Sequence, residues 1–316
     1  MALALTVLAI TQCKKKAQDP VLDQTPPTIT TGPNIVADII SANGAATNNF
    51  TIDASMANTL TIASPTSSNN VKLDIPASAF TNSTSSVISA GVVTVSVKVI
   101  LSKPDIIFSG AGANSSNSRL VTTKGCVKVT ASQNTQTLRL NNSTNFYVAI
   151  PDANVSPLPQ KKYYAPKVTA TDSTQYWALG TDVSNIPFVV YSGINHHQAK
   201  LDSLKWLNVG VQDTSSGART AVTVTVNPMF TKSNSMIYLS YNGELTVGAM
   251  FEISSGIFRI SNVPIGKAVN IVGVAGVNGQ YYAAVLPITV TNSTPIALTM
   301  TAMSQTAMKN LINTVP

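Results

Sequence analysis

A chain of 316 residues is long enough for two compact domains, and its composition limits what those domains can be. Only 10% of the residues are charged and 44% are apolar, while Ser, Thr and Asn are abundant, a composition that favours half-buried strands joined by polar turns. The net charge of +7 includes the lysine run 14–16, and the remaining positive charges form no stripe interleaved with aromatic residues. We therefore expect no nucleic-acid partner.

The amino terminus has the pattern of an export signal. Residues 2–11 are mainly apolar, a stretch too short to cross a bilayer but suited to the hydrophobic region of a signal peptide. The segment from Leu8 to Cys13 resembles a lipobox, at which a peptidase cuts before the cysteine and Cys13 receives acyl chains. Because several acyl chains hold a protein stably on a bilayer, the resemblance implies an outer-membrane lipoprotein of the cell envelope, with the membrane as a partner. A signal cleaved elsewhere and a buried N-terminal strand are the alternatives.

Residues 14–34 are polar and contain prolines, which predicts a flexible linker. Short strand-like runs then recur about every ten residues, separated by Asn, Ser, Gly and Pro, and this spacing indicates a sandwich or barrel. The run 92–100 alternates every second residue, so its valines predict one buried face. The runs 106–108 and 126–131 are also read as strands, and the second places Cys126 as a small buried thiol.

Prolines between Pro151 and Pro166 interrupt the strand pattern and indicate a seam between two sets of strands. Beyond it, Asn242-Gly243 and Asn278-Gly279 each predict a type I′ hairpin turn, and a C-terminal helix is expected over 305–312. The predicted fold is all-β, with two β-sandwich domains joined by a Pro/Trp-containing connector and a short C-terminal helix. The predicted divisions are a signal peptide (1–13), a linker (14–34), a first β-sandwich (35–152), a connector (153–215) and a second β-sandwich with the helix (216–316).

Several stretches carry a family resemblance. The segment from Val71 to Phe80, followed by the runs 91–95 and 102–110, resembles the ZU-type β-sandwich domain shared by ankyrins, netrin receptors and tight-junction scaffolds. Residues 205–208, Lys-Trp-Leu-Asn, and 258–266 are similar to motifs that follow such a domain in Bacteroidota envelope lipoproteins, where a carboxypeptidase-regulatory-like β-sandwich comes second. The resemblance implies two β-sandwiches, protein binding and no catalysis, and it implies no particular substrate.

Residues that could carry catalysis or bind a metal are few and scattered. His196 and His197 are adjacent, so in a strand they would point to opposite faces and make poor joint ligands, even with Asp202 nearby. We expect them in a solvated loop. No Gly-x-Ser-x-Gly motif occurs, and the carboxylates sit beside turns or alternate outward. We therefore predict that the protein is not an enzyme and has no catalytic residue, cofactor or metal site; an enzyme of an unrecognised class is an alternative.

The candidate binding residues are aromatic and lie near the predicted seam: Tyr163, Tyr164, Tyr176, Trp177 and Trp206. Amphipathic rings at a domain junction can stack on sugars or hold a partner protein, although packing between domains uses the same residues. The sequence thus predicts a non-catalytic lipoprotein that acts in protein binding, adhesion or as a scaffold, with another envelope protein as its partner. The alternative is a surface lipoprotein that binds glycans in nutrient capture.

Overall fold

The computed structural model describes residues 35–63, 70–110, 112–115, 118–152, 159–164, 177–180, 184–292 and 295–316. Cys13, the linker 14–34 and Tyr176 lie outside these ranges. Within them strands predominate, in several sheets accompanied by three short helices, which confirms the predicted all-β class.

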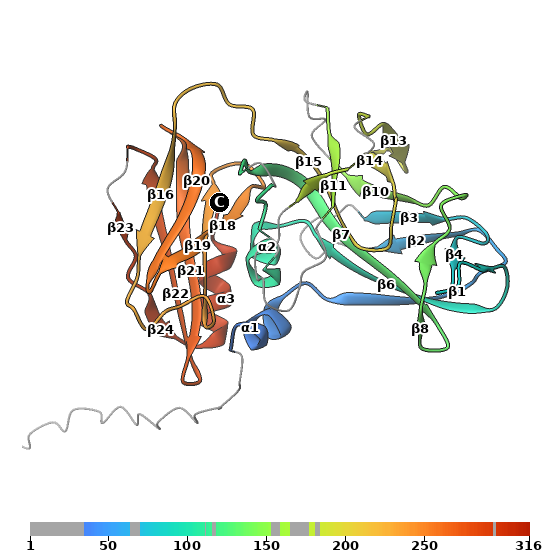
Figure 1. The fold of residues 1–316 in the computed structure, drawn as a ribbon, viewed down its shortest axis with the longest axis horizontal. Coiled ribbons are helices and arrows are strands. Elements are labelled where there is room, and N and C mark those ends of the chain that lie inside the picture. The colour runs from blue at the N-terminus through green and yellow to red at the C-terminus, as the bar shows by residue number, and fades with distance from the viewer. Residues whose placement is uncertain are drawn as a thin grey trace, which may run out of the picture.

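Two large antiparallel sheets form the N-terminal half of the molecule (Figure 1). Sheet I has the order β1-β6-β7-β15-β11-β12, with β8 also paired to β7. Its strands are β1 (Thr47–Asp53), β6 (Val92–Ile100), β7 (Val121–Gln133), β15 (Trp206–Gln212), β11 (Lys161–Tyr164), β12 (Ala178–Leu179) and β8 (Gln136–Thr137). Sheet II has the order β13 (Phe188–Tyr191), β14 (Ile194–Lys200), β10 (Tyr147–Pro151), β3 (Val71–Ile75) and β2 (Asn58–Ile62). A small sheet consists of β5 (Val87–Ile88), β4 (Phe80–Thr81) and β9 (Arg139–Leu140).

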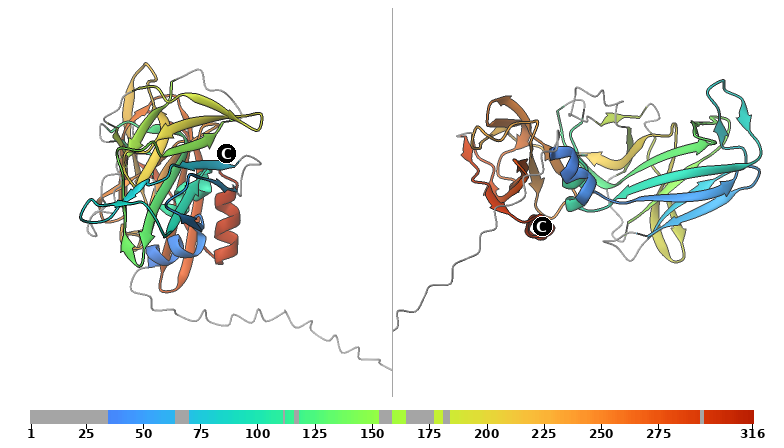
Figure 2. Two further views of the ribbon diagram at one scale, coloured as in Figure 1. Left: turned by 90° about the vertical axis from the view of Figure 1, so that its right-hand side faces the viewer. Right: turned by 90° about the horizontal axis from the view of Figure 1, so that it is seen from below.

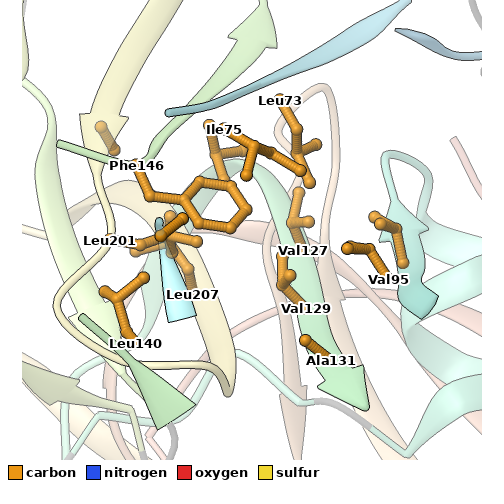
Figure 3. Close-up of a cluster of buried hydrophobic side chains, with 14 of the residues drawn as sticks. Leu73, Ile75, Val95, Val127, Val129, Ala131, Leu140, Phe146, Leu201 and Leu207 are labelled. Carbon is orange, nitrogen blue, oxygen red and sulfur yellow. The ribbon is translucent and has the colours of Figure 1, made fainter. Parts of the chain in front are cut away.

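The valines of β6 have one buried face, as their alternation predicts. Val93, Val95, Val97 and Val99 are buried in the same cluster as apolar side chains of sheet II such as Leu73. Figure 3 shows this cluster, with Val95 from sheet I and Leu73 from sheet II. Because burying each such side chain contributes about 1.5–3 kcal/mol, the apolar layer between sheets I and II is a main source of stability in this half.

Residues 153–215, which the sequence suggested as a connector, contribute strands to both sheets. β14 pairs with β10 and β13 in sheet II, and β15 pairs with β7 and β11 in sheet I. The described part of this segment therefore belongs to the N-terminal unit, by which we mean sheets I and II with the small sheet. Pro151 is the last residue of β10 and lies opposite His196 of β14, and it has no amide hydrogen to donate to the ladder.

The C-terminal unit consists of two further sheets. Sheet III has the order β19 (Phe251–Ser254), β20 (Ile257–Pro264), β16 (Arg219–Thr225) and β23 (Ile296–Ala297). Sheet IV has the order β18 (Val247–Ala249), β17 (Ser235–Tyr241), β21 (Ala268–Val277), β22 (Gln280–Thr289) and β24 (Thr301–Met303). A second buried cluster, which includes Val224 of sheet III and Ile271 of sheet IV, fills the space between them.

The helices are α1 (Ile35–Asn43), α2 (Lys103–Ser109) and α3 (Gln305–Asn313). Helix α2 occupies the apolar run that the sequence suggested as a strand over 106–108, so that prediction was wrong. The local signals explain the helix: the Ser102 hydroxyl accepts a hydrogen bond from the Asp105 amide, Pro104 lies in the first turn, and Gly110 ends the helix with a φ of 69°. The predicted C-terminal helix is confirmed as α3, capped by Ser304.

Among the described residues, no helix has the length and apolarity to cross a bilayer.

A third buried cluster joins the two units. It includes Ile39 of α1, Phe108 of α2, Met308 of α3, Cys126 of sheet I and Val272 of sheet IV. In Figures 1 and 2, α1 and α2 lie between the two sets of strands. The units are therefore connected by continuous apolar packing.

One of the two predicted hairpin turns has the expected form. Between β21 and β22, Asn278 and Gly279 have φ values of 51° and 77°, as a type I′ turn requires, so this prediction is confirmed. After β17 the loop is longer than Asn242-Gly243, because Tyr241 donates its amide hydrogen to the carbonyl of Thr246 and β18 pairs only from Val247 on. The prediction of a two-residue turn there was wrong, and contacts of this loop with β7 are the reason: Thr123 donates to the carbonyl of Leu245.

Candidate functional site

The outward face of sheet I is polar around residues 96–98 of β6 and 128–130 of β7, where alternate side chains point away from the core. While the valines of β6 point into the core, Ser96 and Lys98 point outward from the same strand. Lys128 and Thr130 lie directly opposite them on β7 and also avoid the core. The sheet therefore displays hydroxyl and ammonium groups over its central strands.

A recess of about 280 Å³ lies on this face, where the end of α2 meets the sheet. It is lined by Thr47, Ser96, Lys98, Ser109, Lys128, Thr130 and Trp206. We call it the Trp206 recess. Its volume is close to the lower end of the range of small-ligand sites, about 300–1,000 Å³.

Strand pairing places four of the lining residues in one row. Thr47 of β1 is the partner of Lys98 of β6, Lys98 is the partner of Lys128 of β7, and Lys128 is the partner of Trp206 of β15. Directly opposite side chains have Cβ atoms about 4.5–5.5 Å apart, so the row is a continuous strip of neighbouring groups. An aromatic ring thus lies at one end of the strip, with two ammonium groups in its middle.

Trp206 is half-buried, and its ring centroid lies 6.0 Å from the Nζ atom of Lys128. This distance is at the outer limit of a cation–π contact. The recess offers hydroxyl groups, ammonium groups and an indole ring, and the side chains that line it include no carboxylate, imidazole or thiol. Such a set can bind a polar ligand with a flat apolar face, but it holds no group suited to proton transfer near neutral pH.

Trp206 packs against the cluster that contains Tyr163 and Trp177, but it is more exposed than the other predicted aromatic residues that the structure describes. Tyr163, Tyr164 and Trp177 are only 4%, 7% and 0% exposed. The indole Nε1 of Trp177 donates to the carbonyl of Gly112 at 2.7 Å, inside the cluster that joins the two units. These three residues are therefore packed in the interior. Among the candidate aromatic residues within the described ranges, it is Trp206 that lines a surface recess.

His196 and His197 lie in β14 and are 2% and 0% exposed, so the expectation of a solvated loop was wrong. They make separate contacts, as their adjacent positions in a strand predict. The ring nitrogens of His196 lie 2.9 Å from the carbonyl oxygen of Ile194 and 3.0 Å from that of Asn70. His197 contacts Asp152 through Nε2 at 2.9 Å.

Asp152 links His197 to a lysine of sheet I. The Nζ atom of Lys124 lies 3.0 Å from the same carboxylate oxygen that His197 contacts. Burial lowers the pKa of His197, with Asp152 acting in the opposite direction and Lys124 in the same direction. Burial tends to raise the pKa of Asp152, but the hydrogen bonds and charges of Lys124 and His197 outweigh it and lower that pKa overall. This triad joins the two sheets and favours an ionised Asp152 beside a neutral His197.

Other chemically capable groups are arranged for structure. Burial raises the pKa of the Cys126 thiol to about 12, which makes it a poor nucleophile, although Thr123 weakly favours the thiolate. Among the described residues, no three His, Cys, Asp or Glu side chains are grouped to hold a metal ion. The Trp206 recess is therefore the candidate binding site.

Sequence reasoning selected Trp206 but missed the two lysines beside it. A signal was present, because Val97-Lys98-Val99 and Val127-Lys128-Val129 repeat one pattern in which a lysine points away from a buried valine face. The pattern gives the direction of each side chain. The pairing of β6 with β7 then brings the two lysines together. No protein-family model matches the chain, and no curated protein matches it.

Proposed function

We propose that the protein is a non-catalytic binding protein of the cell envelope that holds a saccharide in the Trp206 recess. The observation that carries the proposal is a half-buried indole in a surface recess whose other walls are hydroxyl and ammonium groups. The apolar face of a sugar ring packs against an aromatic ring, while its hydroxyl groups need hydrogen-bond partners. The recess supplies both kinds of contact.

The test of this proposal is a saccharide array followed by calorimetric titration, with Trp206→Ala as the decisive variant. We expect affinity to fall by about tenfold or more, because an aromatic contact contributes up to about 1.5 kcal/mol beyond its buried area and 1.4 kcal/mol corresponds to tenfold. Trp206→Phe should retain most of the affinity. Ile253→Ala removes a side chain that is 57% exposed on sheet III and serves as the control. Absence of any bound saccharide, or equal affinities for the wild type and Trp206→Ala, would contradict the proposal.

The envelope location is a separate part of the proposal and rests on the segment from Leu8 to Cys13. The sequence resemblance to Bacteroidota lipoproteins with ZU-type and carboxypeptidase-regulatory-like β-sandwiches supports it. Cys13→Ser removes the sulfur that would carry the lipid, so this variant should move from the membrane to the soluble fraction. Unchanged retention in the membrane fraction would exclude the lipid anchor.

A second candidate function, binding of an envelope protein, is favoured by strand β13. β13 lies at the edge of sheet II, and its side chains Phe188 and Val190 are 42% and 66% exposed. An apolar edge strand can accept a further strand from a partner protein. Val190→Lys should abolish recovery of such a partner from native membranes while leaving saccharide binding intact. Equal recovery by the wild type and Val190→Lys would exclude β13 as the contact.

A further inference from the structure

We infer that the saccharide held in the Trp206 recess is anionic and carries carboxylate or sulfate groups. This inference rests on the proposed function and adds the charge of the ligand. It is carried by the relation of Lys98 to Lys128, which are direct cross-strand partners in the centre of the recess.

Like charges that lie directly opposite each other destabilise a sheet. Within the described residues, neither lysine forms an ion pair. Their row ends in Thr47 and Trp206, which carry no charge. On β1, the carboxylate of Asp53 lies six positions from Thr47, about 20 Å along the strand at about 3.3 Å per residue. The free protein therefore holds two unneutralised positive charges side by side.

Protection of a sheet edge does not explain these lysines. Lysine often lies on edge strands, where its charge prevents pairing with other chains. β6 and β7, however, are interior strands of sheet I, with β1 on one side and β15 on the other. Edge protection therefore does not account for Lys98 and Lys128, whereas an anionic ligand would attract both ammonium groups and so offset their repulsion.

The position of the lysines relative to the indole defines the class of ligand. A sugar ring on Trp206 would bring an acidic substituent, or that of the next sugar residue, over Lys128 and Lys98. Thr130 offers a hydroxyl group to neutral positions of the same ligand, while Ser96, its partner in the adjacent row, donates to Asn49 Oδ1 at 2.7 Å and can accept a hydrogen bond from the ligand. Single-stranded nucleic acid also combines charge with stacking, but its binding sites stack successive bases on several aromatic rings. The described lining of this recess has one aromatic residue, which favours the acidic saccharide.

Matched pairs of probes test the inference. Affinities are measured for tetragalacturonate and its methyl ester, and for dextran sulfate and dextran, at about 0.01 M and about 0.1 M salt, where the Debye length falls from about 30 Å to about 10 Å. We expect the anionic member of at least one pair to bind about tenfold more tightly at low salt, and the difference to shrink at high salt. A single-stranded oligonucleotide is titrated alongside.

The double variant Lys98→Gln/Lys128→Gln should weaken binding of the anionic probe by about tenfold and weaken binding of the neutral probe much less, because Gln keeps a hydrogen-bond donor at each position but carries no charge. Lys232→Gln/Lys309→Gln removes the same charge from exposed positions of the C-terminal unit and should keep the wild-type affinity. Equal affinity for neutral and anionic members, equal loss in both double variants, or tighter binding of the oligonucleotide would each overturn the inference. Failure of every saccharide, neutral ones included, would instead overturn the proposed function on which it rests.

Discussion

Two pairs of lysines on sheet I differ in their charged neighbours. Lys124 lies 3.0 Å from Asp152, and Lys162, which is almost fully buried, lies 3.3 Å from Asp202. Lys98 and Lys128, on the outward face, are cross-strand neighbours of each other, and neither forms an ion pair with an acid in the described part of the chain. One sheet therefore contains lysines neutralised by acids of its own fold and lysines without such partners.

The difference separates the requirements of folding from those of binding. A charge removed from water is costly unless a partner compensates it, so the buried Lys162 and the half-buried Lys124 need their carboxylates. Lys128 is exposed and Lys98 is half-buried, and a fold can tolerate charges that keep part of their hydration without a partner. What folding does not explain is their placement opposite each other beside the indole of Trp206. We attribute that placement to a ligand.

Replacing Asp152, the acid that pairs with Lys124, should have the largest effect on stability. Asp152→Asn leaves the buried ring of His197 and the ammonium of Lys124 without their shared carboxylate. We expect a loss of about 3 kcal/mol in the free energy of unfolding, measured by urea denaturation. The control Asp38→Asn, at an exposed position of α1, should cost less than about 1 kcal/mol. Similar losses in both variants would remove the contrast between paired and unpaired charges.

Buried Lys103, whose ammonium group contacts main-chain oxygens, extends the comparison. The Nζ atom of Lys103 donates to the main-chain oxygens of Tyr241 and Pro316, and burial lowers its pKa to about 8, partly opposed by the charge of Glu244. Between about pH 8 and about pH 10.4 the unfolded chain holds a proton at this position that the folded protein has released, so this group should make stability rise with pH there. Lys103→Met should remove this rise in urea denaturation series. A pH dependence unchanged by the substitution would contradict the assignment.

Lowering the pH should reduce the stability of the protein through the titration of His197. Because the pKa of His197 is lowered in the folded protein, the unfolded chain takes up a proton first as the pH falls below about 6.5, and stability declines from there. Asp152, whose pKa is also lowered, adds its loss only below about pH 4. His197→Gln should therefore show a smaller fall in melting temperature between about pH 7.5 and about pH 5 than the wild type. An equal fall in both proteins would show that His197 is not the group responsible.

The smallest expected change in stability comes from replacing Lys98, which has no ion pair in the described part of the chain, and this change is a gain in stability instead of a loss. Lys98→Thr removes the repulsion from Lys128 and introduces a residue favoured in strands, so it should stabilise the free protein by a few tenths of a kcal/mol at low salt. The same variant should bind the anionic saccharide more weakly. Denaturation and saccharide titration of one preparation measure the stability and the affinity, respectively. A loss of stability would mean that Lys98 serves the fold.

The sequence predicts what depends on local pattern. The alternation in β6, the cap of α3 and the turn at Asn278 follow from neighbouring residues, and all three are present. Helix α2 was mistaken for a strand because its apolar run outweighed the capping signals of Ser102 and Gly110 in the sequence interpretation.

Features that depend on distant pairing could not be predicted in this way. His197 meets Asp152 from 45 positions away, and Lys98 meets Lys128 only through the register of β6 on β7. Of the candidate site, the sequence therefore indicated the indole of Trp206 but not the charges beside it. Burial of Trp177 likewise depends on both units meeting around it.

The two indole N–H signals in a nitrogen-resolved NMR spectrum test the central claim most directly. The chain has two tryptophans: Trp206 lines the recess, whereas Trp177 is fully buried and donates to Gly112, so it provides an internal reference. On titration with the saccharide that binds most tightly in the array, we predict a saturable shift of the Trp206 signal and an unchanged Trp177 signal. Saturable binding that leaves the Trp206 signal in place would contradict the account.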